Sequence, residues 1–210
     1  PGALLLFRMG DFYESFDDDA QILADVLGIA LTSRPMGREG RIPLAGVPYH
    51  QLERHLTRLI AAGHRVAIAE QLSPPGRGLV DRAVVRVVSP GTIDAGEAVE
   101  GGAHNWLVAA VPGTAARSMG PGELPLWGVA RCDVTTGELE LELVPEEELA
   151  GEWARLGPAE LLLPDEPSVD DGVFAAAIPP AGCALTPRPV RDFTTRRAAE
   201  RLAERFGVRW

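Results

Sequence analysis

Two aromatic residues and two carboxylates are gathered in the stretch Asp11-Phe12-Tyr13-Glu14, which follows Gly10 and an apolar run. An exposed aromatic ring can stack on a flat surface such as a nucleobase. A neighbouring carboxyl group can accept a hydrogen bond, and it can also donate one when it is protonated. The same spacing fits a plain structural role, because Asp11 and Glu14 occupy the N-cap and N3 positions of a helix capping box.

The residues around this stretch predict a strand followed by a helix. Residues 3–7 are a short apolar run typical of a buried strand. From Asp11 onward, apolar residues recur at three- and four-residue steps, and Gly28 is a suitable residue to end a helix. The apolar stripe consists of Tyr13, Phe16, Ala20, Leu23 and Leu27. On such a helix Phe12 lies at the margin of the stripe and Glu14 nearly opposite, so both can face outward at its N-terminal end.

The remaining pattern predicts two α/β domains. We expect a first domain at 1–95, a linker at 96–106 and a second domain at 107–210. In the first domain we expect a strand at 29–33, a basic loop at 34–41, a helix at about 51–62 and two β-branched strands. In the second, the alternation of residues 139–144 predicts a strand, whose neighbouring carboxylates Glu138, Glu140 and Glu142 would form its solvent face.

Charge is distributed unevenly along the 210 residues, whose formal net charge is −10. Residues 34–86 carry nine arginines and four acidic residues, whereas residues 101–210 carry ten arginines and seventeen acidic residues. The first region can therefore meet a polyanion, and the acidity of the second disfavours one. No apolar run is long enough to span a membrane, and we expect a cytoplasmic protein without a secretory signal.

Metal and nucleotide motifs are not evident in the sequence. Cys132 and Cys183 are far apart, which indicates neither a disulfide framework nor a zinc site. The histidines also lack metal-ligand spacing; they are His50, His55, His64 and His104. All 20 basic residues are arginine, so a lysine-containing P-loop is excluded.

Several motifs in the same order resemble the bacterial DNA mismatch-repair family MutS. The first half carries "LLLFRMGDFYESFDDDA", "IALTSR", "IPLAGVPYH", "VAIAEQL" and "VVRVVSPGT". It resembles the family's N-terminal mismatch-recognition domain, a small α/β domain with a mixed sheet. The second half carries "NWLVAAV", "VARCDVTTGELELELV" and "RRAAERLAERFGV". It is similar, more loosely, to the family's connector domain, which is α/β and ribonuclease-H-like.

The resemblance implies a DNA-binding role for the opening stretch. Phe12 and Glu14 match the family's Phe-x-Glu motif, in which the ring is a wedge inserted from the minor groove and the acid hydrogen-bonds the displaced base. We expect Glu14 to carry or share a proton when bound, because DNA surrounds it with negative charge. Supporting contacts are expected from Met9, Asp11, Thr32, Arg34, Arg38, Arg41, Leu44, Tyr49 and Arg58. For each arginine, an ordinary solvated surface charge is the alternative.

The resemblance also implies partners. They are mismatched double-stranded DNA, a MutL-like protein that binds the connector domain, and a second subunit in a homodimer acting at the bacterial nucleoid. ATP and Mg²⁺ belong to other domains of the family, so we expect this chain to be a non-enzymatic N-terminal piece without a cofactor. Two alternatives remain open. Asp133 on a central strand could belong to a two-metal nuclease if other carboxylates converge on it. Residues 101–210 could instead serve only as a structural or partner-binding module.

Overall fold

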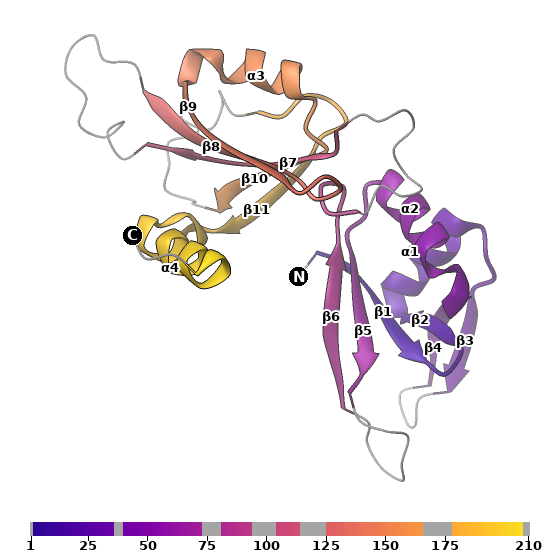
Figure 1. The fold of residues 1–210 in the computed structure, drawn as a ribbon. Coiled ribbons are helices and arrows are strands. Elements are labelled where there is room, and N and C mark those ends of the chain that lie inside the picture. The colour runs from indigo at the N-terminus through magenta and orange to yellow at the C-terminus, as the bar shows by residue number, and fades with distance from the viewer. Residues whose placement is uncertain are drawn as a thin grey trace. The chain divides into compact units, whose positions relative to one another are not determined.

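The computed structural model describes residues 2–35, 40–72, 81–93, 104–113, 125–165 and 178–207. It forms two compact units, Pro1–Gly101 and Gly102–Trp210 (Figure 1). The boundary falls inside the range 96–106, where we expected a linker. The first strand of the second unit begins at Trp106. Each unit has its own sheet and its own hydrophobic core.

Unit 1 is a six-stranded mixed sheet with two helices. Its strands are β1 (Leu4–Met9), β2 (Phe12–Phe16), β3 (Thr32–Pro35), β4 (Arg41–Pro48), β5 (Val66–Gln71) and β6 (Arg82–Val88). Their order in the sheet is β3-β4-β2-β1-β5-β6, and only the β1–β5 pair is parallel. The helices are α1 (Asp17–Leu27) and α2 (Leu52–Ala61), with a 3₁₀ turn, η1 (Tyr49–Gln51), before α2.

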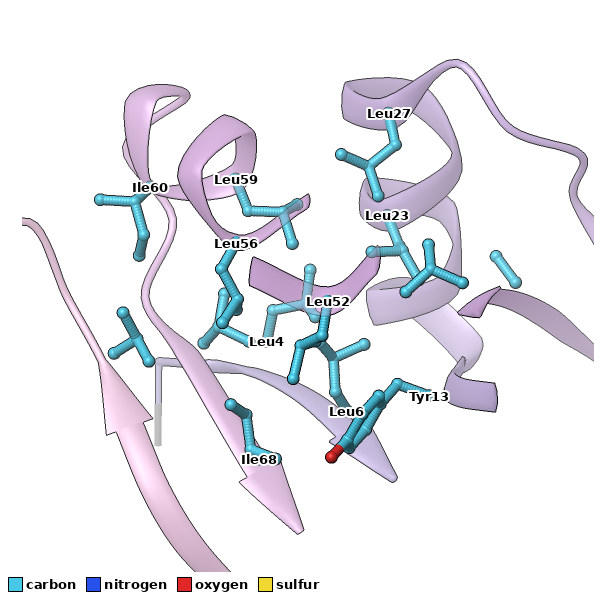
Figure 2. Close-up of a cluster of buried hydrophobic side chains, with 14 of the residues drawn as sticks. Leu4, Leu6, Tyr13, Leu23, Leu27, Leu52, Leu56, Leu59, Ile60 and Ile68 are labelled. Carbon is cyan, nitrogen blue, oxygen red and sulfur yellow. The ribbon is translucent and has the colours of Figure 1, made fainter. Parts of the chain in front are cut away.

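The core of unit 1 lies between one face of this sheet and the two helices. Figure 2 shows Leu6 and Ile68 of the strands beside Leu23 of α1 and Leu56 of α2, and all four are buried. Burial of each leucine or isoleucine side chain contributes roughly 1.5–3 kcal/mol, so this layer fixes the sheet against the helices. We call the opposite face of the sheet its outer face.

The N-terminal end of α1 differs from the prediction. Residues 12–16, expected in the first turn of a helix, form strand β2, and the helix begins at Asp17. The capping-box interpretation of Asp11 and Glu14 is therefore wrong. Strand β2 pairs with both β1 and β4, and this non-local pairing overrides the helical spacing of Tyr13 and Phe16.

Side chains replace the sheet hydrogen bonds where β2 turns into α1. The pairing of β1 with β2 ends at Phe7, so Leu5 lies outside this ladder. The Ser15 hydroxyl donates to the Leu5 carbonyl at 2.7 Å, and the Leu5 N–H donates to the Asp19 carboxylate at 2.8 Å. Asp17 takes a left-handed conformation, with φ 54°, at the bend. The Asp17–Asp19 run thus ends a strand as well as opening a helix, and Asp19 accepts a hydrogen bond from the backbone of β1.

Unit 2 is a five-stranded mixed sheet. Its elements are β7 (Trp106–Pro112), β8 (Leu126–Asp133), β9 (Glu138–Pro145), η3 (Glu146–Glu148), α3 (Leu149–Leu156), β10 (Glu160–Asp165), β11 (Ala184–Pro189), η5 (Val190–Phe193) and α4 (Thr195–Phe206). The order is β11-β10-β7-β8-β9, with β7, β8 and β9 antiparallel and β10 and β11 parallel to β7. A mixed α/β unit is what we expected for the second half of the chain. Trp127 of β8 and Trp153 of α3 are buried in its core.

Glu138 of β9 is exposed as predicted, but the rest of the strand differs from the prediction. Leu141 and Leu143 are exposed to 69% and 71%, whereas Glu140 and Glu142 lie on the side that α3 covers. Arg131 on β8 explains this, because its guanidinium pairs with Glu140, with Glu142 at 2.7 Å and with Glu152 of α3 at 3.2 Å. A part-buried cation with three carboxylate partners draws Glu140 and Glu142 toward α3, and both stay less exposed than Leu141 and Leu143.

Among the described residues, no helix combines the length and the apolar character needed to cross a membrane.

Candidate nucleic-acid interface

The stretch that carries the two aromatics and two carboxylates is a β-hairpin. Met9 of β1 pairs with Phe12 of β2, so Gly10 and Asp11 form a two-residue turn. Gly10 has φ 60°, as the first central position of a type II′ turn requires, and glycine takes this conformation without steric strain. The turn is held from η1, because the Tyr49 N–H donates to the Asp11 carbonyl at 2.9 Å. We call residues 9–12 the hairpin tip.

Strand alternation places Phe12 and Glu14 on the outer face. Tyr13 and Ser15 are buried on the helical side of β2, and alternate residues of a strand point to opposite faces. The Phe12 side chain is 45% exposed at the tip, and Glu14 is half-buried one pleat further along. Both residues thus face outward together, as expected. The cause is the two-residue period of a strand, whereas the prediction relied on the end of a helix.

Tyr13 fastens the hairpin to the rest of the sheet. Its hydroxyl donates a hydrogen bond to the Glu70 carboxylate of β5, and Figure 2 shows the ring among the core side chains. Burial raises the pKa of Tyr13, and the hydrogen bond to Glu70 raises that pKa further. The neutral phenol is therefore the form that the fold favours.

Arg8 holds the turn from within. Its Nε donates to the Gly10 carbonyl at 2.6 Å, and its guanidinium carbon lies 4.1 Å from the centre of the Tyr49 ring and 5.3 Å from that of Tyr13. A cation over two aromatic faces is attracted to both of them. The cation restrains β1, β2 and η1 together, so the tip presents Phe12 from a well-fixed turn.

Four further predicted residues share the outer face. Cross-strand partners point to the same side of a sheet, and pairing links Phe12 to Met9, Phe16 to Leu44, and Leu44 to Thr32. Arg34 lies two residues beyond Thr32 on β3 and is exposed. The Thr32 hydroxyl is bonded to the Leu44 carbonyl at 3.1 Å, and Met9 Sδ accepts from Arg82 at 3.2 Å.

Other predicted residues lie elsewhere or have other contacts. Tyr49 is 47% exposed in η1, beside the tip. Arg41 donates to the hydroxyl and carbonyl of Ser33, at 2.8 and 2.6 Å. Arg58 of α2 donates to the carbonyls of Val26 and Leu27, at 3.0 and 3.1 Å, where it caps the C-terminus of α1 on the helical side. Arg38 lies outside the described residues.

The range 34–41, expected to be a basic loop, begins and ends with strand residues. Arg34 belongs to β3 and Arg41 to β4, and the two strands pair in register as far as Pro35 and Arg41. The two arginines are therefore held by a sheet, which fixes the direction of their side chains more firmly than a loop would.

Sequence reasoning missed three residues that lie against this stretch: Arg8, Glu70 and Gly46. Arg8 and Glu70 are distant along the chain from their partners at Tyr49 and Tyr13, so local spacing gives no signal for them. Gly46 does give a signal, because glycine inside a strand often marks a close approach of neighbouring groups.

Asp133, the possible nuclease residue, is fully buried at the end of β8. It accepts hydrogen bonds from the Thr135 N–H and hydroxyl at 2.9 and 2.7 Å, from the Asn105 N–H at 3.2 Å and from His104 Nδ1 at 3.0 Å. Burial alone would raise the pKa of Asp133, but these hydrogen bonds outweigh it and lower the pKa to about 2. Its oxygens therefore hold the β8–β9 turn and the start of β7 in place.

Converging metal ligands are not found in the part of the chain that the structure describes, where no three His, Cys, Asp or Glu side chains are placed to hold an ion. Burial raises the pKa of both cysteine thiols, that of Cys183 to about 11. The feature that the described geometry does offer is an aromatic and acidic hairpin tip on a sheet with arginines at its β3–β4 end.

These features define a two-unit α/β protein whose first unit projects an aromatic and acidic pair and whose second has a ribonuclease-H-like strand order. Comparison with known sequences gives the family. The profile of MutS domain I matches residues 1–97, and that of MutS domain II matches residues 108–209. The chain belongs to the MutS family and carries its domains I and II.

Curated relatives agree with this assignment. The chain is 38% identical to the DNA mismatch repair protein MutS of a Synechococcus species, over 100% of the chain and 24% of the relative. It is 42% identical to proteins of the same name from Cereibacter sphaeroides and Syntrophobacter fumaroxidans, over 99% of the chain and 23% of each relative. The chain thus spans about a quarter of the length of the relatives it matches.

Proposed function

We propose that unit 1 recognises mispaired or unpaired bases in duplex DNA, with Phe12 as a wedge inserted from the minor groove. The observation that supports this best is the joint placement of Phe12 and Glu14 on the outer face, with an exposed ring at the tip of a braced hairpin. With 45% of its surface exposed, Phe12 keeps a part of its ring that the fold does not cover. It gains stacking energy if it enters a base step.

The physics of a mispair suits such a wedge. A mispaired step is easier to unstack and kink than a matched one, so the same ring enters it at lower free-energy cost. Stacking depends little on which base is present and contributes roughly 1–3 kcal/mol per base. A phenylalanine can therefore serve many different mispairs, but it leaves the orientation of the displaced base undetermined.

Glu14 supplies the orientation in this proposal, through a hydrogen bond to the displaced base. It follows Phe12 by one pleat on the same face, so the carboxyl group reaches the groove beside the ring. The phosphates around it favour a protonated or proton-sharing carboxyl group in the complex. In ordinary duplex, where no base is displaced, the same acid repels the backbone and helps to reject matched DNA.

Positively charged and polar groups around the tip complete the interface. Arg34 and Arg41 at the β3–β4 end, together with Arg38, which lies between them in the sequence, would neutralise phosphates and fix the register of the duplex without reading the mispair. Met9, Asp11, Thr32, Leu44 and Tyr49 would line the wedge. Arg58 would contribute by capping α1, since its guanidinium is used there.

We further propose that unit 2 connects unit 1 to other parts of the family's longer proteins and contacts a MutL-like partner. The excess of acidic residues over residues 101–210 favours a protein contact over a DNA contact there. ATP, Mg²⁺ and the homodimer interface would belong to regions beyond these two domains, and the protein would act in the bacterial cytoplasm at the nucleoid.

The test is a titration of the 210-residue chain with a matched duplex and a duplex carrying a single unpaired T, at low salt and followed by fluorescence anisotropy. The wild-type chain should bind the bulged duplex more tightly. Phe12→Ala should reduce this preference by roughly 5- to 150-fold, the equivalent of one stacking contact. Glu14→Gln should retain binding but discriminate less, because an amide can donate the hydrogen bond of a protonated carboxyl group.

Two matched controls separate recognition from general effects. Leu72→Ala removes another exposed apolar side chain of unit 1, and Asp18→Asn neutralises an acidic residue that is exposed on α1. Neither should change the preference for the bulge. Equal affinity of the wild-type chain for both duplexes, or a Phe12→Ala variant with unchanged preference, would overturn the proposal. So would loss of bulge binding by Glu14→Gln at every pH.

A further inference from the structure

Gly46 lies in the middle of β4, directly opposite Glu14 of β2. Glycine in a strand interior is unfavourable, because it packs no side chain and loses more conformational freedom on folding than other residues. Several glycines of the described chain have positive φ angles that explain their identity, but Gly46 is not one of them. Because the backbone of Gly46 has an ordinary strand conformation, the backbone does not explain why this position holds glycine. The explanation must lie in the space around it.

The space above Gly46 is occupied by Glu14. A Cβ atom at position 46 would lie 3.1 Å from Glu14 Cγ and 3.1 Å from the Tyr13 carbonyl oxygen, closer than nine in ten contacts of real Cβ atoms. The Tyr13 carbonyl belongs to a strand that is paired on both sides and yields little. The flexible Glu14 stem would therefore have to move.

Glu14 has a bulky neighbour on its other side. Phe7 of β1 is its partner in the register, and the Phe7 ring packs against Phe16 with 5.8 Å between centroids. The Glu14 stem consequently lies between an aromatic ring and a position without a side chain. With Phe7 held by Phe16, the gap over Gly46 determines where the carboxyl group can point.

We propose that Gly46 is a positioning residue that sets the direction of the Glu14 carboxyl group beside Phe12. The inference deepens the proposed function and rests on it for its effect on DNA binding. A Cβ at position 46 displaces the Glu14 stem away from β4, so the carboxyl group no longer meets a base displaced by the wedge. Phe12, on the neighbouring Met9–Phe12–Pro48 row, keeps its place.

The first experiment needs no DNA. Gly46→Ala should shift the side-chain NMR signals of Glu14 and change its rotamer in a crystal structure, while the signals of Phe12 remain in place. Gly128→Ala is the matched control, because Gly128 also lies in a strand and its added Cβ would meet only Val111 Cγ1 at 3.5 Å and Val111 O at 3.9 Å, which are ordinary contacts. An unchanged Glu14 rotamer in Gly46→Ala would overturn the proposal.

A double-mutant cycle then tests whether Gly46 acts through Glu14. Gly46→Ala should lower the preference for the bulged duplex by roughly three- to tenfold in the wild-type background and by less than about twofold in Glu14→Ala. Thermal unfolding gives a parallel readout, because truncating Glu14 removes the crowded Cγ and should recover part of any stability that Gly46→Ala loses. An equal effect of Gly46→Ala in both backgrounds would show that it acts elsewhere.

The two proposals fail in distinguishable ways. If recognition by Phe12 is wrong, Phe12→Ala leaves the bulge preference unchanged, whereas the Glu14 rotamer still changes in Gly46→Ala. If positioning by Gly46 is wrong, Phe12→Ala and Glu14→Gln behave as expected and the Glu14 rotamer does not respond.

Discussion

The hydroxyl of Tyr13 on β2 donates a hydrogen bond to the carboxylate of Glu70 on β5, and this contact spans the intervening strand β1. Tyr13 stands between Phe12 and Glu14 in the sequence but points the opposite way. The residue that separates the two outward-facing groups thus fixes the strand that carries both of them.

Removing this hydroxyl should destabilise unit 1. We expect Tyr13→Phe to lower the free energy of unfolding by about 1–2 kcal/mol at pH 7, because the part-buried Glu70 carboxylate loses a donor. The raised pKa of Tyr13 gives the pH dependence. The neutral phenol stabilises the fold fully below about pH 10 and progressively less as the pH rises through the higher pKa of the folded state. The difference between wild type and variant should therefore shrink above pH 10 in urea unfolding curves.

Tyr49 is the other of the two tyrosines and provides the control. Its ring lies over Arg8, and Tyr49→Phe keeps that ring. We expect this variant to unfold within about 0.5 kcal/mol of wild type, as exposed substitutions usually do. Equal losses in Tyr13→Phe and Tyr49→Phe would contradict a structural role for the Tyr13 hydroxyl.

Arg34 and Arg58 should behave oppositely. Arg34 is exposed on the outer face, so Arg34→Ala should weaken binding to matched and bulged duplexes alike and reduce the slope of log affinity against log salt by about 1. Arg58→Met keeps the apolar stem but removes the cap on α1. It should leave the salt slope unchanged and lower the free energy of unfolding by about 1–2 kcal/mol. A reduced salt slope in Arg58→Met would instead identify this residue as a phosphate contact.

Asp133 should stabilise unit 2 through its charge. A pKa of about 2, against an ordinary value of 3.8, corresponds to roughly 2 kcal/mol of folding free energy. This contribution is present above about pH 4 and is lost as the pH falls through 2. Asp133→Asn should therefore lower stability at pH 7 and flatten its acid dependence between pH 4 and 2. Tryptophan fluorescence reports this unit selectively, because all four tryptophans lie in residues 102–210.

The matched control for Asp133 is Asp165→Asn, an exposed aspartate at the end of β10, which should leave both properties unchanged. The same variants examine the nuclease alternative. We expect wild type and Asp133→Asn to show the same absence of Mg²⁺-dependent cleavage. Cleavage by the wild type that Asp133→Asn abolishes would revive a catalytic assignment for this site.

The order of strands and helices could be predicted from apolar periodicity, but the start of α1 could not. Tyr13 and Phe16 fit the helical steps of Ala20 and Leu23, and Tyr13 and Ser15 equally fit the alternation of a strand. Pairing with β4, about thirty residues away, decides between these patterns. The local signal that was available was the Gly10-Asp11 pair, whose glycine suits a two-residue hairpin turn.

The exposed face of β9 could not be read from its own sequence for a similar reason. Alternation predicts the strand, and because carboxylates are usually solvated, it also predicts that the glutamates lie outside. The neighbouring strand contributes Arg131, which reverses that preference. The sequence predicts the outward direction of Phe12 and Glu14 correctly but from an incorrect element, whereas the roles of Arg8 and Glu70 depend on contacts between distant segments.

The turn at Gly10 and Asp11 also limits how this region can change in evolution. In a strand that begins at a two-residue turn, a substitution at one position leaves the direction of the other side chains unchanged. Inserting or deleting one residue moves all later side chains to the opposite face. Such a change in β2 would bring the Tyr13 side chain out of the core and turn the Glu14 carboxylate into it. We therefore expect homologous chains to vary in residue type along β2 far more readily than in its length.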